Sequence, residues 1–165
     1  MATVWVLGDQ LNRSIGALGR ADPGVDRVLL VESESLLISR RWHRPRAHLV
    51  IAAMHRLAAE LREEGFEVDH RHAATLLDGL RAHRARHPDD PVVMTEPNSH
   101  DLRRRVDGLD VELVRSDQFL CHYDDFAEWA SGRTQLKMED FYRWRRAETG
   151  YLMSGDEPVT GRWNY

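Results

Sequence analysis

Short runs of apolar residues recur along the first 115 positions and predict five β-strands: residues 3–7, 27–32, 67–72, 91–95 and 110–115. The first, second and fourth runs contain the stretches VWVL, VLLV and VVM, which is typical of strands buried on both faces. The third and fifth runs are polar or alternating, which is typical of sheet edges. The pattern therefore predicts a sheet in the order 3-2-1-4-5.

Between these runs, apolar residues recur with the period of a helix. In RAHLVIAAMHRLAAELREEG, Val50, Met54, Leu57 and Leu61 are spaced to line one helical face, and Gly65 follows as a left-handed cap. Shorter helices are predicted after the caps Thr75 and Ser99. Strands that alternate with helices indicate an α/β fold, with three layers and a parallel sheet covered on both faces.

The pattern changes after residue 115. The stretch 116–165 is rich in aromatic residues and carries no further strand signal. We expect helices at 124–130 and 137–149, followed by an extended connector that ends on Trp163-Asn164-Tyr165. Because a natural C-terminus seldom finishes on bare aromatic residues, we expect the chain to be cut from a longer protein.

Composition narrows the class of protein. The net charge of −4 gives no overall basic field for nucleic acid, and the single cysteine, Cys121, argues against disulfides, a cysteine-ligated zinc and an iron–sulfur cluster within this chain. No apolar run approaches the roughly 18 residues of a membrane span, and the N-terminus leaves no room for a signal peptide. These observations favour a cytoplasmic location.

The turn after the first strand reads VWVLGDQLN, and it is unusual for this fold. Ligands of open α/β sheets bind past the carboxyl ends of strands at the switch point, here between strands one and four. Asp9 would repel a phosphate, and no G-x-G-x-x-G follows. Two interpretations stay open: Asp9 caps a following helix, or Asp9 and Gln10 bind a neutral, polar ligand.

Two further stretches have a structural and a functional interpretation. Glu32, Ser33 and Ser35 end the second strand beside the turn, or are a solvated strand end. The run RRWHRPRAHL places arginines around Trp42 and His43, which suits phosphate contacts and base stacking but is more often a solvated approach to a helix. The arginines are Arg40, Arg41, Arg44 and Arg46.

The histidines predict no metal site. His83 and His87 are four residues apart on a helix, and His70 and His72 share a strand face, but neither pair has an evident third ligand. We expect these side chains to face solvent. G-x-S-x-G is absent, and the pairs Asp124-Asp125 and Glu139-Asp140 are predicted to be surface and capping groups, so no catalytic residue is predicted.

Several stretches together resemble the N-terminal domain of the deoxyribodipyrimidine photolyase-related family, the iron–sulfur branch of the photolyase/cryptochrome superfamily, also called bacterial or prokaryotic (6-4) photolyases. The matching stretches are LGDQL, HRPRAHLVIAAMHRLAAEL, TEPNSHDLRRRVDG and the long block from FLCHYDDFAEW to GRWNY. The resemblance spans essentially the whole chain, and the terminal block is its most specific part.

The resemblance implies a Rossmann-like antenna domain at 1–115 and a helical segment and connector at 116–165. In the family this domain can hold an antenna chromophore, in several members a ribityl-lumazine. The missing C-terminal domain holds FAD and an iron–sulfur cluster, and an electron from light-excited reduced flavin splits a flipped-out pyrimidine photoproduct in DNA.

The resemblance also implies a chromophore site. Gly8, Asp9 and Gln10 match the GDQ that faces the chromophore, Glu32 matches an acid at the end of strand two, and Ser33, Ser35 and His43 lie nearby in the sequence. Leu36 stands where lumazine-binding members carry a second acid, and Trp42-His43-Arg44-Pro45 replaces a His-His-Lys-rich run. Lumazine, another chromophore and none therefore all stay open.

The leading hypothesis is the antenna and structural domain of a flavin-dependent DNA repair photolyase, inactive without its FAD-binding partner domain and reaching DNA only through the full-length protein. One alternative is a stand-alone small-molecule or nucleotide sensor, although TEPNSH after strand four lacks the glycines of a phosphate loop. Another is a cryptochrome-like photoreceptor, which these residues do not distinguish from a repair enzyme.

Overall fold

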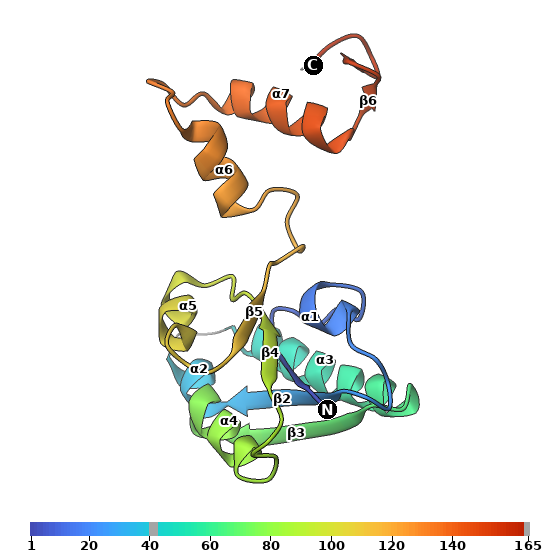
Figure 1. The fold of residues 1–165 in the computed structure, drawn as a ribbon, viewed down its shortest axis with the longest axis vertical. Helices are drawn as coiled ribbons and strands as arrows, with labels where there is room; N and C mark the ends of the chain where they lie inside the picture. The colour runs from blue at the N-terminus through green and yellow to red at the C-terminus, as the bar shows by residue number, and fades with distance from the viewer. Residues whose placement is uncertain (40–42, 164–165) are drawn as a thin grey trace. The chain divides into compact units, whose positions relative to one another are not determined.

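Five parallel strands form one sheet in the computed structural model, which describes residues 1–39 and 43–163 (Figure 1). The strands are β1 Thr3–Val6, β2 Arg27–Ser33, β3 Glu67–Ala73, β4 Val92–Thr95 and β5 Glu112–Val114. Their order is β3-β2-β1-β4-β5, so the predicted α/β fold, the sheet order and the two edge strands are all confirmed. The bounds differ from the predicted ones by at most two residues at each end.

The central position of β1 places the turn at residues 8–10 at the switch point. Trp5 pairs with Leu29 of β2 on one side and with Met94 of β4 on the other. Helix α1, Gly16–Gly19, follows this turn, and the connection from β2 to β3 contains α2, Glu34–Ile38, and α3, Arg44–Glu63. The remaining crossovers contain α4, Leu76–Arg84, and α5, His100–Val106.

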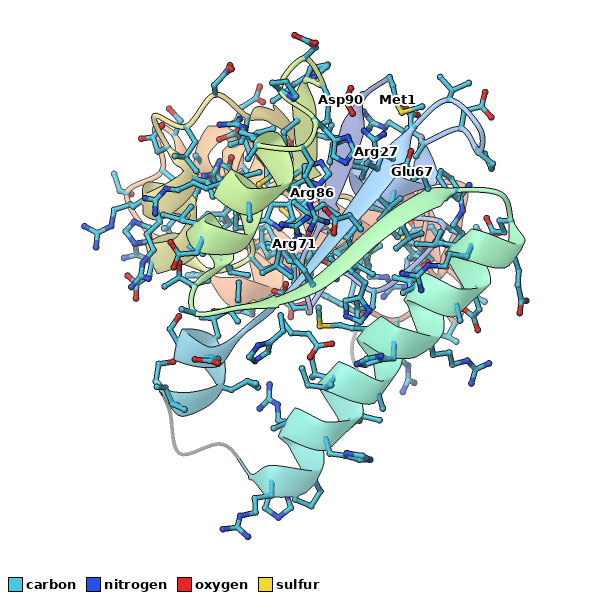
Figure 2. The ribbon with its side chains drawn as sticks, turned by 90° about the horizontal axis from the view of Figure 1, so that it is seen from below. Met1, Arg27, Glu67, Arg71, Arg86 and Asp90 are labelled. Carbon is cyan, nitrogen blue, oxygen red and sulfur yellow. The ribbon has the colours of Figure 1, made fainter. Side chains whose placement is uncertain are left out.

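The sheet buries a separate apolar core on each face. Val4, Val6, Val28 and Leu30 pack with α3, whereas Trp5, Leu7, Leu29 and Val31 pack with α4 and α5. Figure 2 shows α3 and α4 on opposite sides of β2 and β3. Because side chains alternate between the faces of a strand, every second residue of β2 and β3 faces α3. Glu32 and His70 are among these residues, which matters for the site below.

Local chemistry explains where the longer helices begin and end. Helix α3 carries Pro45 in its first turn and buries Met54, Leu57 and Leu61 of the predicted stripe; it is followed by Gly65 at φ +98°. The Thr75 side chain accepts a hydrogen bond from the Asp78 N–H, so its predicted capping role is confirmed. Ser99 occupies the N-cap position of α5 without a side-chain cap bond.

The prediction that His83 faces solvent is wrong, because its side chain is fully buried. Its Nε2 lies 2.9 Å from Thr3 Oγ1 and its Nδ1 lies 2.6 Å from Asp69 Oδ2. Burial lowers the pKa of His83 below its ordinary value despite the attraction of Asp69. Burial alone would raise the pKa of Asp69, but hydrogen bonds from Arg71 and His83 outweigh that and lower it. The buried imidazole is therefore neutral at pH 7 and joins α4 to two strands.

A second polar network lies beside the first at the amino-terminal end of the strands, and the Thr3 hydroxyl, which donates to Asp90 at 3.5 Å, connects the two. Arg27 is buried and its guanidinium pairs with Asp90 and, at 2.7 Å, with Glu67. Figure 2 shows these three residues together near Met1. The hydrogen bond from Arg27 is the main cause that lowers the pKa of Glu67. Through these two ion pairs, buried Arg27 connects β2 to β3 and to the loop before β4.

The chain divides after Gln118, and residues 119–165 form a second compact unit. It contains α6, Tyr123–Ala130, and α7, Met138–Thr149, close to the predicted ranges. The expectation of no further strand is wrong, because β6, Met153–Ser154, pairs antiparallel with β7, Glu157–Pro158. Two-residue strands are too short to leave an alternating pattern in a sequence.

Aromatic packing holds the two helices of this second unit together. Rings of Phe126 and Trp129 from α6 meet Phe141 and Trp144 from α7, with centroids 5.1 to 6.0 Å apart. Buried Arg146 donates to the Tyr142 hydroxyl at 3.0 Å and to carbonyls of the chain that follows α7. The arginine thereby fixes the start of the hairpin against the helix.

Some sequence predictions fall on residues that are not described. Arg40, Arg41 and Trp42 of the basic run, and Asn164 and Tyr165 at the end, lie outside the described residues. Arg44 and Arg46 are exposed in the first turn of α3. Among residues 1–39 and 43–163, no helix combines the length and the apolar character that crossing a bilayer requires.

The buried His83 predicts how stability depends on pH. The free energy of unfolding should decrease as pH falls below 6.5, the ordinary pKa of histidine, because the unfolded chain then binds a proton that folded His83 does not. Each such histidine contributes at most about 1.4 kcal/mol per pH unit. His70, whose pKa burial also lowers, acts in the same direction. Asp69 acts in a separate window, below its ordinary value of 3.8.

Urea unfolding between pH 8 and pH 5 measures this dependence. The His83→Gln variant should be less stable at pH 8, yet lose less stability on acidification than the unmodified chain. An unchanged dependence on pH in this variant would contradict the assignment of a neutral, buried His83.

Candidate functional site

Polar side chains gather where the parallel strands end, on both sides of β1. On the side of β4 and β5 they are Asp9, Gln10, Asn98 and Gln118; on the side of β2 and β3 they are Glu32, His55 and His70. We call the first group the amide cluster and the second group the histidine cluster. Open α/β sheets bind ligands at this edge, so both clusters occupy a position suited to binding.

The amide cluster links the three loops that follow β1, β4 and β5. The Asn98 side-chain amide donates to Asp9 Oδ2 at 3.1 Å and to Gln118 Oε1 at 2.8 Å. The Gln118 amide donates to the Asp9 carbonyl oxygen at 2.7 Å. Asp9 and Asn98 are exposed and Gln118 is half-buried, so carboxylate and amide groups meet at an accessible surface.

The alternative role of Asp9 as a helix cap is wrong. Residues 9–15 form turns and irregular chain, and the next helix, α1, begins only at Gly16, with Ile15 at its N-cap. Asp9 therefore makes no capping bond, and its carboxylate is turned toward Asn98. Its side chain is available at the switch point, as the ligand-binding interpretation requires.

Gln10 is buried beside Asp9 and faces the end of β4. Its Nε2 donates to the Glu96 carbonyl oxygen at 2.8 Å, whereas its Oε1 is buried and has no hydrogen-bond partner among the described residues. A buried acceptor without a donor costs about 1–3 kcal/mol. Gln10 thus joins the turn to β4 and leaves one acceptor unused.

Supporting contacts hold the loops around the amide cluster. Glu96 accepts hydrogen bonds from the Ser116 N–H at 3.2 Å and from Arg103 at 3.1 Å. Asp117 accepts from the Gly16 N–H at 2.7 Å. Gly16 has φ +54° and lies so close to Thr95 that a Cβ there would approach the Thr95 Oγ1 to 2.1 Å, so only glycine fits. The loops are therefore fixed by bonds outside the amide cluster itself.

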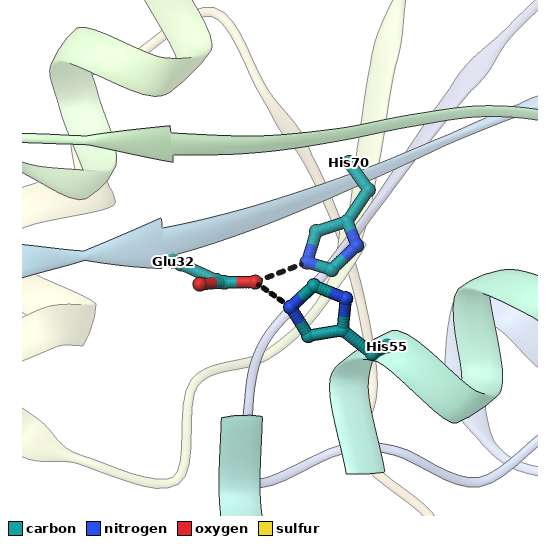
Figure 3. Close-up of side chains that lie close together, drawn as sticks. All are labelled: Glu32, His55 and His70. Atoms are coloured by element: carbon teal, nitrogen blue, oxygen red, sulfur yellow. Dashed lines mark ion pairs between the residues drawn. The ribbon is translucent and has the colours of Figure 1, made fainter. Parts of the chain in front are cut away.

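The histidine cluster lies on the face that α3 covers (Figure 3). Glu32 at the end of β2, His70 of β3 and His55 of α3 point toward one another (Figure 3). The Oε1 atom of Glu32 is 2.8 Å from His55 Nε2 and 2.7 Å from His70 Nε2. The Glu32 carboxylate is therefore directed at the two histidines and away from β4.

The other predicted site residues lie at the beginnings of helices or at a close backbone contact. Ser33 is buried and caps α2 by accepting from the Leu36 N–H at 3.4 Å, and its hydroxyl lies 3.0 Å from that of Ser35. His43 is exposed at the N-cap position of α3. A Cβ on Gly8 would lie 3.2 Å from Val50, so α3 packs close to the backbone of the turn.

The predicted site residues thus do not form one group. Gly8, Asp9 and Gln10 adjoin the amide cluster, Glu32 belongs to the histidine cluster, and the serines and His43 begin helices. A single ligand that contacts all seven stays a prediction.

The sequence prediction that no third ligand approaches the histidine pairs is wrong. Glu32 joins His70, although its second histidine is His55 and not His72, whose side chain is exposed and lies 3.5 Å from Glu34. Asp69 joins His83 and His87. Strand pairing places Glu32 of β2 beside His70 of β3, helix α3 adds His55, and the packing of α4 brings His83 to Asp69 of β3.

Comparisons with known proteins match nearly the whole chain. A sequence model of the family described as deoxyribodipyrimidine photo-lyase-related protein matches residues 4–165. A (6-4) photolyase of Agrobacterium fabrum (strain C58 / ATCC 33970) is 34% identical over 174 residues, which cover 98% of this chain and 34% of the relative. The chain therefore spans about a third of the length of the curated relative that it matches.

Substitutions of the neighbouring residues Asp9 and Gln10 distinguish a side chain that stabilises the fold from one that is exposed and does not. Gln10→Ala should lower the free energy of unfolding by about 1–3 kcal/mol, because the half-buried Glu96 carbonyl loses the donor that buried Gln10 supplies. Asp9→Ala, in the same turn but exposed, should change it by less than about 0.5 kcal/mol. Urea unfolding at pH 7 gives both values, and equal losses would contradict the distinction.

Proposed function

Because the chain belongs to the deoxyribodipyrimidine photo-lyase-related protein family, we propose that it is the N-terminal domain of a flavin-dependent photolyase, which uses light to split pyrimidine photoproducts in DNA. The observation that carries the proposal is the extent of the match. It covers 98% of this chain but only 34% of a relative that is named a (6-4) photolyase. The chain corresponds to one part of such an enzyme.

The share of the relative that the match covers indicates which parts of the enzyme this chain would supply. The groups that bind FAD and the iron–sulfur cluster belong to the remaining two thirds of the full-length protein, as does the surface that holds the damaged base. The 165 residues supply an α/β scaffold, and the second unit, residues 119–165, leads toward the flavin-binding domain. Alone, the chain should repair nothing. It contacts DNA only through the full-length protein.

The amide cluster is the part of the chain suited to an antenna chromophore. Such a group absorbs light and passes the excitation to the flavin. Asp9, Asn98 and Gln118 present carboxylate and amide groups at the switch point, and Gln10 Oε1 is a buried acceptor without a donor. This donor and acceptor set suits a neutral ring with polar edges, such as a ribityl-lumazine, and does not suit a phosphate. In this proposal Glu32, Ser33, Ser35 and His43 do not contact the ring.

An exchange of domains tests the proposed function. In the A. fabrum relative, the part matched by this chain is replaced by the 165 residues, and the purified chimera is assayed for light-dependent repair of a duplex that carries one (6-4) photoproduct. We expect repair in the chimera and none with the 165-residue chain plus FAD and reductant. A second chimera with an unrelated α/β domain of similar size is the control.

Two results would overturn the proposal. One is repair by the isolated 165-residue chain in light. The other is a chimera that binds flavin normally, folds cooperatively and yet repairs no more than the control chimera.

Titration with ribityl-lumazine, followed by its fluorescence, tests the chromophore. We expect saturable binding to the unmodified chain, weakened by about 1–3 kcal/mol in Asp9→Ala because one hydrogen bond to a charged acceptor is lost. Asp101→Ala, which removes an exposed carboxylate from α5, is the matched control and should bind as the unmodified chain does. Failure of the unmodified chain to bind would exclude lumazine.

A further inference from the structure

The histidine cluster brings three metal-ligating side chains from three different elements to one point (Figure 3). Glu32 comes from β2, His70 from β3 and His55 from α3. One atom of each, the carboxylate oxygen and the two Nε2 atoms, lies within 4.8 Å of both others. Residues that are 15 to 38 positions apart in the chain do not converge through local geometry, so the sheet register and the placement of α3 create the cluster.

The contacts within the histidine cluster are two ion pairs that share one carboxylate oxygen. Both imidazole nitrogens approach the same Glu32 oxygen, at 2.7 and 2.8 Å, and the two rings stand edge to face with centroids 4.5 Å apart. His70 Nε2 is buried, and despite its short distance to Glu32 it makes no hydrogen bond of acceptable geometry. Three potential ligand atoms thus converge on one point, and both imidazole nitrogens are directed at the same carboxylate oxygen, where an ion could take their place as its partner.

We propose that Glu32, His55 and His70 bind a divalent first-row transition-metal ion. Two histidines and one carboxylate are a recurrent ligand set for zinc and for iron(II), and such sites leave further positions for water or another ligand. With zinc bonds of about 2.0–2.2 Å, tetrahedral geometry separates ligand atoms by about 3.3 Å. The present separations require outward shifts of about half an ångström, which a carboxylate on a rotatable side chain can supply.

The surroundings of His70 favour the form that binds an ion. Ligating imidazoles must be neutral, and burial of His70 lowers its pKa, so this side chain is neutral at pH 7. The carboxylate supplies one negative charge to the ion. Arg62 is a nearby cation whose positive charge opposes binding of a metal ion. Its guanidinium donates a hydrogen bond to the Val68 carbonyl oxygen at 3.2 Å.

The ion can reach the cluster from solvent. The side chains of Glu32 and His70 are 15% and 7% exposed, whereas that of His55 is 63% exposed. Two ligands are thus held by the sheet, and the third lies on the solvent side and can adjust when the ion enters. The open coordination positions would face the same side as His55.

The other histidine group makes a useful contrast. Asp69, His83 and His87 also bring three ligand atoms together. However, His83 Nδ1 already contacts Asp69 and its Nε2 contacts Thr3, so neither nitrogen is free for an ion. At His83 the second ring nitrogen contacts Thr3, which is not a metal ligand of this group, whereas the ion pairs of His55 and His70 are both with Glu32, the third proposed ligand.

The metal site does not rest on the proposed photolyase function. It uses Glu32, which the resemblance linked to a chromophore, and an ion on this carboxylate leaves the chromophore to the amide cluster. Failure of the domain exchange would leave the metal site standing, and absence of metal binding would leave the domain exchange unaffected.

Titration of the chelator-stripped 165-residue chain with Zn²⁺ by calorimetry, and with Co²⁺ by visible absorption, tests the proposal. We expect one equivalent to bind, and the Co²⁺ spectrum to show imidazole and carboxylate ligation. Glu32→Gln and His55→Gln should each weaken binding by more than the roughly 10–100-fold that loss of a supporting group costs, because each removes a ligand.

Two histidine variants serve as controls. His48→Gln alters an exposed histidine of the same helix, and His87→Gln alters the other histidine group; both should bind as the unmodified chain does. Circular dichroism verifies that each variant is folded, and exposed His55 is the substitution least able to disturb the core. No binding by the unmodified chain, affinity that survives both ligand substitutions, or affinity that His87→Gln removes would each overturn the proposal.

Discussion

Burial of β1 on both faces and along both edges is the constraint on which the rest of the structure depends. Its side chains enter two cores, and its backbone pairs with β2 and β4, so the strand cannot shift without disrupting both layers. The chain leaves this strand at Leu7, and the turn that follows must lie where the sheet order reverses. Both polar clusters are consequences, because each is built from the ends of strands that this central strand aligns.

The two sides of β1 differ because of what covers them. Toward β4 and β5, loops meet, the Asn98 amide donates to the Asp9 carboxylate and the Gln118 amide donates to the Asp9 carbonyl oxygen, so the surface suits a neutral polar ligand. Toward β2 and β3, α3 packs close to Gly8 and brings His55 over Glu32 and His70. One sheet edge thereby offers two chemically distinct environments, whereas the family resemblance placed Asp9 and Gln10 of the first and Glu32 of the second in one chromophore site.

The sheet could be predicted because the hydrophobic pattern reflects burial: VWVL is typical of a strand buried on both faces, and EVDHRH is typical of an edge strand. The site could be predicted in part. Asp9 could be predicted as a site residue from the sequence of its turn. Asn98 and Gln118 could not, because they lie in loops whose sequences have no hydrophobic periodicity. His83 and His70 were misjudged because a histidine buried against a carboxylate has the same local sequence as an exposed one. Their carboxylate partners come from tertiary packing: the pairing of β2 with β3 supplies Glu32, and the packing of α4 on β3 supplies Asp69.

The central claim is that the strand ends carry two separate binding environments, and one NMR measurement tests it most directly. Backbone amide and imidazole signals of the 165-residue chain are followed during titration with ribityl-lumazine and, in a second sample, with Zn²⁺. The structure predicts two distinct sets of shifts, around Asp9, Asn98 and Gln118 for the ring and around Glu32, His55 and His70 for the ion. Identical sets of shifted residues for both ligands, or shifts for neither, would contradict it.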